Sequence, residues 1–406
     1  MRDRWNPMAR KGPGDVRVRS NSQRRGAAAL FAVALGALAL TAGCAGRDRP
    51  SADDRDTPVP VAPPRPAQQP PVPPPSGPER YVAMTGDDSA SGAVDAPWRT
   101  LQHAFESLRP GDRLYVRGGT YVEDVDIPGP AMHQGSAEHP IWVQPQPGEE
   151  VVLQGLLWLT NPSYWHLDGI NVTWASGHRA DQHMVKLIGG TGWSLTGAEL
   201  SHAHSYAALL IGGGATAFRV AGNFVHDTHP SNAPNQDHLI YVDNGPDGSG
   251  VIERNVLARS PNGRGVKLGP GSLEEPGTSH IVIRYNTFFD NRGPSNVQLS
   301  GSSSDNLIVG NLFHTAGRGS TNVSGYRLSG TGNVVADNLG WQSQGVADFS
   351  LPGLVDGGGN VSADPVLVDP GSDDFNAILP NADTYGAPAV TTRAVARGLA
   401  GPSPAG

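Results

Sequence analysis

Residues 281–286 read Ile-Val-Ile-Arg-Tyr-Asn, and related stretches recur before and after them. The central aliphatic positions of these stretches are Leu167, Leu195, Val220, Ile252, Ile283, Ile308 and Val335. Successive positions are 28, 25, 32, 31, 25 and 27 residues apart. A motif that returns at this period indicates a solenoid, in which each copy packs only against its neighbours.

A second series of short segments lies within the same period. Its members are Met184-Val-Lys-Leu-Ile, Ala208-Leu-Leu-Ile, Ile240-Tyr-Val-Asp, Val266-Lys-Leu-Gly, Val297-Gln-Leu-Ser and Tyr326-Arg-Leu-Ser. This alternation of apolar and variable residues before a turn former is typical of a short strand. The period is too short for a strand and a helix in each copy, so each copy supplies two or three strands. We therefore predict an all-β fold, a right-handed single-stranded parallel β-helix, with strands about 4.8 Å apart.

An asparagine stands three residues after each of the last five anchors. These residues are Asn223, Asn255, Asn286, Asn311 and Asn338. Identical amides stacked one above another can bond to each other and satisfy buried polar groups at every turn. We predict a structural asparagine ladder rather than a catalytic role.

The segments before the repeat form a recognisable string. They are Tyr81-Val-Ala-Met-Thr-Gly-Asp-Asp, Pro97-Trp-Arg-Thr-Leu-Gln-His-Ala, Pro110-Gly-Asp, Tyr115-Val-Arg-Gly-Gly-Thr-Tyr and Ile141-Trp-Val-Gln. Their order and spacing resemble the capping entrance of pectate-lyase-like (pectin lyase-like) β-helix proteins, and the segment from Gly359-Asn360 to Phe375 resembles the closing part. The resemblance implies that a capping helix over residues 100–108 plugs the first coil, where an open end would expose apolar core.

The N-terminus has the features of an export signal. Residues 1–25 are polar and basic, and residues 26–43 carry no charge. The uncharged stretch ends in Leu40-Thr-Ala-Gly, directly before Cys44. Together these residues resemble the lipobox of bacterial lipoproteins, which implies a lipid anchor on Cys44. Because Cys44 is the one cysteine of the chain, a disulfide scaffold and a Cys-rich zinc site are excluded.

A proline-rich segment follows the cysteine. Residues 47–78 hold 12 of the 36 prolines, which favours an extended spacer. We expect a signal peptide at 1–43, a disordered tether at 44–78, a β-helix domain at 79–390 and a flexible tail at 391–406. The protein is then exported, and is either lipid-anchored to the outer face of a bacterial cell membrane or secreted.

The charge distribution limits the partners. The chain of 406 residues has a formal charge of −8, and residues 1–43 hold eight basic against two acidic residues, so the remainder carries −14. This excess of negative charge argues against nucleic-acid binding. It also repels acidic polysaccharides, so binding one would depend on the local cations Lys186, Arg264, Lys267 and Arg327. We expect a monomer.

The second series predicts a polar surface. Its flanking residues, such as Val266 and Leu268, point inward, so its central residues form an outward column. The predicted column is Lys186, Leu209, Tyr241, Lys267, Gln298 and Arg327. Such a column on a flat sheet makes a groove wall for an extended glycan, because one coil step approximates one sugar.

Titratable residues concentrate in the turns beside this column. They are His202, His204, His226, Asp227, His229, Asp237, His238 and Arg264. A cluster of this kind above a polar groove is the active-site candidate. We expect His202 and His204 to bind substrate together with Lys186, Gln298 and Arg327.

β-Elimination on a uronic-acid polysaccharide suits these residues. It needs a cation for the sugar carboxylate, a base for the C5 proton and a donor to the leaving oxygen. In similar β-helix lyases the base is a lysine or arginine on a sheet, which Lys267 matches. Arg264 would lower the pKa of Lys267, and Tyr241 or His238 would protonate the leaving group.

The resemblance also implies calcium, without an organic cofactor. Its candidate ligands are Asp227, Asp237, Asp243 and Asp247. Three alternatives remain: a glycoside hydrolase, for which Asp243 is the only acid in the groove, a uronate epimerase, and a surface protein that binds glycan without catalysis.

Overall fold

The computed structural model describes residues 73–229, 236–317, 320–377 and 385–387. The predicted signal peptide, Cys44, most of the tether and the tail from 391 lie outside the described residues. The first strand begins at Glu79, where the sequence places the start of the β-helix domain. No helix in the described ranges is long and apolar enough to cross a membrane.

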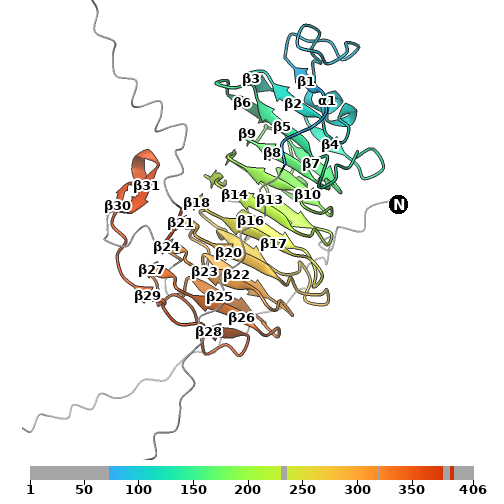
Figure 1. Ribbon diagram of the computed structural model, residues 1–406. Helices are drawn as coiled ribbons and strands as arrows, with labels where there is room; N and C mark the ends of the chain where they lie inside the picture. The colour runs from blue at the N-terminus through green and yellow to red at the C-terminus, as the bar shows by residue number, and fades with distance from the viewer. Residues whose placement is uncertain (1–72, 230–235, 318–319, 378–384, 388–406) are drawn as a thin grey trace, which may run out of the picture. The chain divides into compact units, whose positions relative to one another are not determined.

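Three parallel sheets form the body of the domain (Figure 1). The 11-stranded first sheet contains β1 (Glu79–Val82), β2 (Arg113–Val116), β5 (Ile141–Pro145), β8 (Trp165–Asp168), β11 (Ser194–Thr196), β14 (Phe218–Ala221), β17 (Gly250–Glu253), β20 (Ile281–Arg284), β23 (Leu307–Val309), β26 (Asn333–Ala336) and β28 (Leu354–Asp356). The 8-stranded second sheet contains β4 (Val125–Ile127), β7 (Leu157–Thr160), β10 (Val185–Ile188), β13 (Ala207–Gly212), β16 (His238–Asp243), β19 (Val266–Leu268), β22 (Val297–Ser300) and β25 (Val323–Tyr326). The 10-stranded third sheet contains β3 (Gly119–Tyr121), β6 (Val151–Gln154), β9 (Ile170–Thr173), β12 (Glu199–Ser201), β15 (Phe224–His226), β18 (Val256–Ala258), β21 (Thr287–Phe289), β24 (Leu312–His314), β27 (Leu339–Trp341) and β29 (Val361–Ser362).

From β2 to β25 the chain visits the three sheets in turn, so each of these coils gives one strand to each sheet. This is the predicted right-handed parallel β-helix. After the last coil, β30 (Leu367–Asp369) and β31 (Asp374–Ala377) form an antiparallel hairpin. Short 3₁₀ helices span Ala180–Gln182 and Pro370–Ser372.

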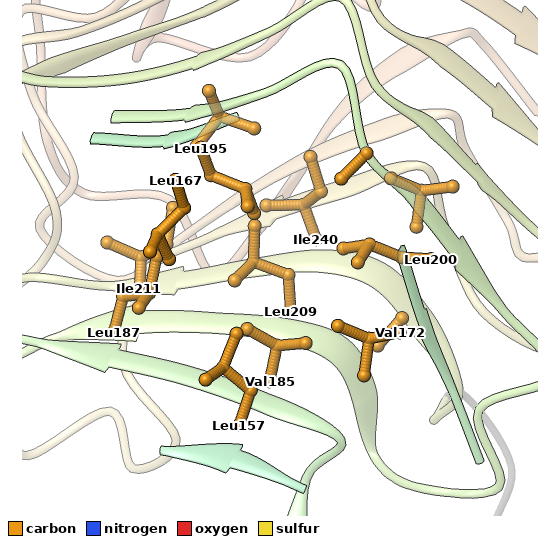
Figure 2. Packing of buried hydrophobic residues seen from close by; sticks show 14 of the residues in the cluster. Leu157, Leu167, Val172, Val185, Leu187, Leu195, Leu200, Leu209, Ile211 and Ile240 are labelled. Carbon is orange, nitrogen blue, oxygen red and sulfur yellow. The ribbon is translucent and has the colours of Figure 1, made fainter. Parts of the chain in front are cut away.

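The predicted anchors lie opposite one another in the first sheet. Each of the first six anchors pairs with the next, from Leu167 with Leu195 to Ile308 with Val335. Their side chains are buried and meet the inward residues of the other sheets. Figure 2 shows this stacking for Leu157, Val185, Leu209 and Ile240, which are register partners in successive coils. The repeat period therefore gave the correct register here.

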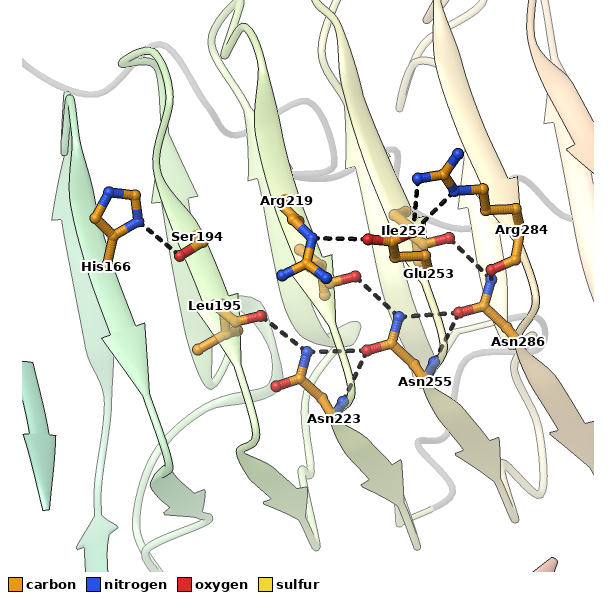
Figure 3. A network of polar contacts seen from close by, with 11 residues as sticks. His166, Ser194, Leu195, Arg219, Asn223, Ile252, Glu253, Asn255, Arg284 and Asn286 are labelled. Atoms are coloured by element: carbon orange, nitrogen blue, oxygen red, sulfur yellow. Dashed lines mark hydrogen bonds and ion pairs between the residues drawn. The ribbon is translucent and has the colours of Figure 1, made fainter. Parts of the chain in front are cut away.

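The asparagine ladder is also confirmed (Figure 3). The Nδ2 group of Asn223 donates to Oδ1 of Asn255 at 2.9 Å, and the same bond recurs from each asparagine to the next, through Asn338. Asn360 extends the ladder by one coil. These amides are buried and also bond to backbone groups, so they close the turn between the first and third sheets.

The capping helix covers the first coil as predicted. Helix α1 spans Leu101–Ser107 between Thr100, whose side chain accepts from the backbone of His103, and Leu108. It buries Leu101, Ala104 and Phe105, and the Phe105 ring lies 5.6 Å from that of Trp165. The apolar face of one short helix thus closes the N-terminal end of the core.

Two positions of the predicted outward column are wrong. Leu209 is fully buried and pairs with Val185, so its neighbour Leu210 occupies the column. Ser324 pairs with Gln298, so it replaces Arg327, which lies beyond the end of β25 with its guanidinium 5.7 Å from the Tyr326 ring. Strand β13 has no polar residue that distinguishes its two faces, and β25 lacks the second inward aliphatic residue of the other copies.

A buried carboxylate ties three coils together on the first sheet (Figure 3). Glu253 binds Arg219 at 2.7 Å and Arg284 at 2.8 Å, and its own side chain is 4% exposed. Although burial raises its pKa, the two arginines outweigh that effect and hold the pKa of Glu253 below its usual range.

Glu253→Gln is expected to destabilise the fold by about 2–4 kcal/mol near neutral pH, because two partly buried arginines lose their counter-charge. The lowered pKa means that the contribution of Glu253 is complete above its unfolded value of about 4.3 and is lost as pH falls through the folded value. Urea denaturation of both proteins should therefore show a stability difference that shrinks in acid. A difference that stays constant to low pH would contradict this account.

Candidate functional site

The outer face of the second sheet carries a column of side chains in register. From the first coil to the last these residues are Asp126, Trp158, Lys186, Leu210, Tyr241, Lys267, Gln298 and Ser324. Their neighbours along each strand point into the core, which fixes the direction of the column. Lys186, Tyr241, Lys267 and Gln298 therefore lie where the sequence predicts them.

The centre of the column is a three-residue cluster of Tyr241, Asp243 and Lys267. The Lys267 ammonium lies 4.3 Å from the centroid of the Tyr241 ring in the neighbouring coil. The Tyr241 hydroxyl donates to Oδ2 of Asp243 at 3.3 Å, and the Gly271 backbone donates to the same oxygen. Tyr241 and Asp243 are two residues apart on β16, so both point to the outer face.

Burial sets the protonation of this cluster. Burial is the main reason that the pKa of Lys267 is lowered to about 8. The charge of Asp243 raises this pKa, and the charge of Arg264 lowers it. Burial raises the pKa of Asp243 to about 6, despite the Gly271 hydrogen bond. It also raises the pKa of Tyr241, so the hydroxyl keeps its proton. The cluster thus offers an amine that is easily neutralised beside a protonated phenol.

His238 was expected to protonate the leaving group, but it is buried away from the outer face. Its side chain is 1% exposed, and its Nδ1 accepts the backbone N–H of Arg264 at 3.2 Å. Burial, together with the charges of Lys267 and Arg264, holds its pKa well below the usual value. Because it is sealed beneath the sheet surface, His238 positions the Arg264 backbone and does not reach a substrate.

A cavity of about 730 Å³ lies on the side of the later coils, where Gln298, the register partner of Lys267, lines it. Arg264, Gln298, Ser324 and Tyr326 line it, together with Gln344, Ala347, Asp348 and Phe349. Arg264 is 2% exposed and its Nε donates to Ser295 at 3.1 Å. The cavity therefore contains a buried cation and two members of the outward column.

The predicted histidine cluster lies around a different recess. This recess, of about 430 Å³, is lined by His202, Asp227, Thr228, His229, Arg259, Pro261, Asp290 and Arg292 and shares no residue with the first cavity. The His204 ring lies 5.7 Å from that of His229. His202, Asp227, Arg259 and Asp290 each directly follow a strand of the third sheet. The structure thus separates His202 and His204 from the Lys267 cluster, because they stand on the third-sheet side of their turns.

The four aspartates proposed to bind calcium do not come together. Asp227 binds His226 at 2.6 Å and Arg259 at 2.8 Å in the second recess. Asp237 is buried and accepts from Asn262, Asp243 belongs to the Lys267 cluster, and Asp247 is exposed in a turn. No three His, Cys, Asp or Glu residues within the described ranges form a group that could hold a metal ion. The predicted ligand set is corrected accordingly.

Sequence reasoning missed the second aromatic residue of the column. The Lys186 ammonium lies 3.7 Å from the Trp158 ring centroid, and Trp158 Nε1 donates to the His183 carbonyl at 2.9 Å. This pair repeats the arrangement of Lys267 and Tyr241 three coils earlier. The alternation in Leu157-Trp-Leu-Thr, which matches Val185-Lys-Leu-Ile, was the available signal.

Comparisons with known proteins find short sequence matches. A pectate lyase, PEL9, of Emericella nidulans is 35% identical over 75 residues, which is 18% of this chain and 18% of that protein. The uncharacterised protein YwoF of Bacillus subtilis is 36% identical over 80 residues, covering 20% of this chain and 16% of the relative. The chain thus matches less than a fifth of each relative's length.

Among solved structures, pectate lyase Pel9A aligns with a TM-score of 0.45 at 13% identity, over 76% of this chain and 86% of that one. No protein-family profile matches the chain.

Proposed function

We propose that the chain is a polysaccharide lyase that cleaves a uronic-acid glycan by β-elimination. The observation that carries the proposal is the Lys267 amine, which projects from the outer face of the second sheet with its pKa lowered to about 8, against Tyr241. A lysine that is partly neutral near physiological pH is suited to act as a general base. The short match to a pectate lyase agrees with this class of substrate.

The proposed reaction uses two residues of the cluster. The neutral Lys267 amine takes the C5 proton of a uronate, the C4–O bond breaks, and a double bond forms between C4 and C5. The Tyr241 hydroxyl gives its proton to the leaving oxygen, and Lys267 can return a proton to the phenolate beside it. Asp243 orients Tyr241 through the 3.3 Å hydrogen bond.

The rest of the column forms the groove for the glycan. Strands in a sheet are about 4.8 Å apart, which approximates the length of one sugar in an extended chain. Successive coils can therefore contact successive sugars. Lys186 and Trp158 lie on one side of Lys267, and Gln298 and Ser324 on the other. The groove thus has cations along an otherwise acidic protein, as an acidic glycan requires.

A substrate screen tests the proposal. The full chain is incubated with pectate, alginate and glycosaminoglycans, with and without calcium, and the ultraviolet absorbance of the unsaturated product is followed. We expect absorbance to rise with at least one of these polymers. Tight binding to a polyuronate without any such product would instead identify a glycan-binding protein without catalysis.

The rate should depend on pH through Lys267. Since the base must be neutral, kcat/KM is expected to rise with pH and level off above a value of about 8. The Asp243 charge raises the pKa of Lys267, so Asp243→Asn should move the rising limb to lower pH, by about one unit or less. Asp247→Asn, an exposed change in the following turn, should leave the limb in place. A shift to higher pH in Asp243→Asn would contradict the assignment of Lys267 as base.

A glycoside hydrolase is the second candidate. The Asp243 carboxyl has a pKa of about 6, chiefly because of burial, and the charge of Glu275 raises it further. Two interacting carboxyl groups are the usual requirement for glycoside hydrolysis. Asp243→Asn abolishing activity, while Lys267→Gln retains it, would favour this candidate.

We also propose that the protein is exported and held at the outer face of a bacterial membrane by lipid on Cys44. The uncharged stretch before the cysteine and the proline-rich spacer after it support this proposal. Mass spectrometry of the protein from its natural host should show the chain beginning at an acylated Cys44.

A further inference from the structure

We infer that the 730 Å³ cavity is a carboxylate subsite in which the guanidinium of Arg264 binds the acid group of a uronate. The inference rests on the proposed function for the class of ligand and goes beyond it by assigning the group that holds the carboxylate. The described aspartates form no group that could hold a metal ion. In this inference a cationic side chain of the protein therefore neutralises the carboxylate.

Arg264 is buried and has no acidic partner among the described residues, in contrast to four other arginines of the later coils. Arg219 and Arg284 bind Glu253, Arg259 binds Asp227 and Asp373, and Arg292 binds Asp290. Among the described residues the Arg264 side chain donates only to Ser295, and its buried Nη1 has no partner. A buried, uncompensated cation is costly, so an anion at this position would be strongly favoured.

The fold holds Arg264 in place before any ligand arrives. Its backbone N–H donates to His238 at 3.2 Å, and its carbonyl accepts from Leu239 at 2.9 Å. The preceding Gly263 approaches the Asp237 carbonyl so closely that an added Cβ would lie 2.3 Å from that oxygen. The Ser295 hydroxyl, which accepts from Arg264, in turn accepts from Ser324 at 2.8 Å. A donor fixed in this way loses little freedom when it binds an anion.

The cavity has the size and surface for a sugar acid. Its volume lies within the range of about 300–1,000 Å³ that small-molecule sites occupy. The Gln298 side chain supplies a polar wall and the rings of Tyr326 and Phe349 supply apolar ones. One acid, Asp348, also lines the cavity, but its Oδ1 accepts from the backbone and the hydroxyl of Ser350.

The position of the cavity orients the glycan. The Ser295, Gln298 and Ser324 side chains belong to the coils that follow Lys267, whereas Leu210, Lys186 and Trp158 belong to the coils before it. A glycan that crosses Lys267 would therefore place a uronate carboxylate at Arg264 on the side of the later coils. Arg264 acts here as a binding residue, and its charge also helps to keep Lys267 neutral.

The test is a calorimetric titration of the full chain with galacturonate, glucuronate, mannuronate and guluronate. The methyl esters and the neutral parent sugars serve as probes that lack the charge. We expect at least one free acid to bind and its ester to bind about tenfold more weakly or worse, because a hydrogen bond to a charged group is lost. Arg264→Met should remove this preference, whereas Arg264→Lys should keep part of it.

Arg284→Met is the matched control, since Arg284 is a partly buried arginine with an acidic partner. It should lower the melting temperature and leave uronate binding unchanged. Arg264→Met should melt at or above the temperature of the original protein, because it removes an uncompensated buried charge. A large drop in its melting temperature would show that the fold itself neutralises Arg264, which would overturn the inference.

The remaining outcomes separate this inference from the proposed function. Equal binding of acid and ester, or the absence of heat with all four acids, overturns the subsite even if the chain eliminates a polyuronate. Charge-dependent uronate binding that Arg264→Met abolishes supports the subsite even if no polymer is cleaved.

Discussion

Lys267→Gln is expected to reduce kcat by about 10²–10⁴-fold on whichever polyuronate the chain cleaves, the usual contribution of a general base. Glutamine is one atom shorter than lysine, keeps a polar end and loses the basic amine. The fold should remain intact, because the side chain projects from the outer face of the sheet. Burial disfavours the charge of its amine and lowers the pKa to about 8, so losing that charge should cost little stability. Initial rates and melting temperatures of the two proteins check this prediction.

Lys186→Gln is the matched control for this experiment. Lys186 also lies over an aromatic ring in the same column, 3.7 Å from the Trp158 centroid. It stands three coils from Lys267, so its loss should raise KM and change kcat far less. If the two variants lose the same fraction of kcat, Lys267 acts in binding alone and the proposed mechanism is wrong.

Asn286→Ala is expected to destabilise the domain by about 3–5 kcal/mol, because several buried groups lose their partners at once. The Asn286 amide donates to the Ile252 carbonyl at 2.9 Å and to Asn311 at 3.0 Å, and its Oδ1 accepts both the backbone and side-chain N–H of Asn255. Removing it interrupts the ladder in the middle. The denaturant midpoint of the purified variant measures the loss.

Asn376→Ala provides the surface comparison, since Asn376 is exposed and its amide donates to the nearby Asp374. Its effect should stay within about 0.5 kcal/mol. An Asn286 variant as stable as the Asn376 variant would show that the ladder does not hold the coils together.

The repeat was predictable because each anchor occupies the same physical environment. An aliphatic residue in the core and a turn return in each copy, and in the later copies an asparagine amide returns as well, so Ile283 and Asn286 each have equivalents above and below. Lys267 and Tyr241 could be placed for the same reason, since apolar residues on both sides define their direction.

Register was lost where this contrast disappears. Strand β13 reads Ala-Ala-Leu-Leu-Ile-Gly, in which no polar residue distinguishes the faces, and Leu209 was exchanged with Leu210. In β25 the sequence Val-Ser-Gly-Tyr lacks the second aliphatic residue, so the strand was placed too late and Arg327 replaced Ser324.

The site as a whole needed the structure. His202 and His204 were grouped with His238 because all three lie in neighbouring turns of the sequence. In the structure His202 lines the second recess, whereas His238 is buried. The cavity at Arg264 likewise depends on Gln344, Ala347, Asp348 and Phe349, which approach from a later coil. Such contacts between loops carry no periodic signal.

The most direct test of the central claim is the chemistry of the product. The substrate identified in the screen is cleaved in water enriched in the heavy oxygen isotope, and the fragments are analysed by mass spectrometry and NMR. β-Elimination predicts a C4–C5 double bond at the new non-reducing end and no heavy oxygen gained during cleavage. Saturated fragments that have each gained one heavy oxygen atom from water would show hydrolysis and contradict the lyase assignment.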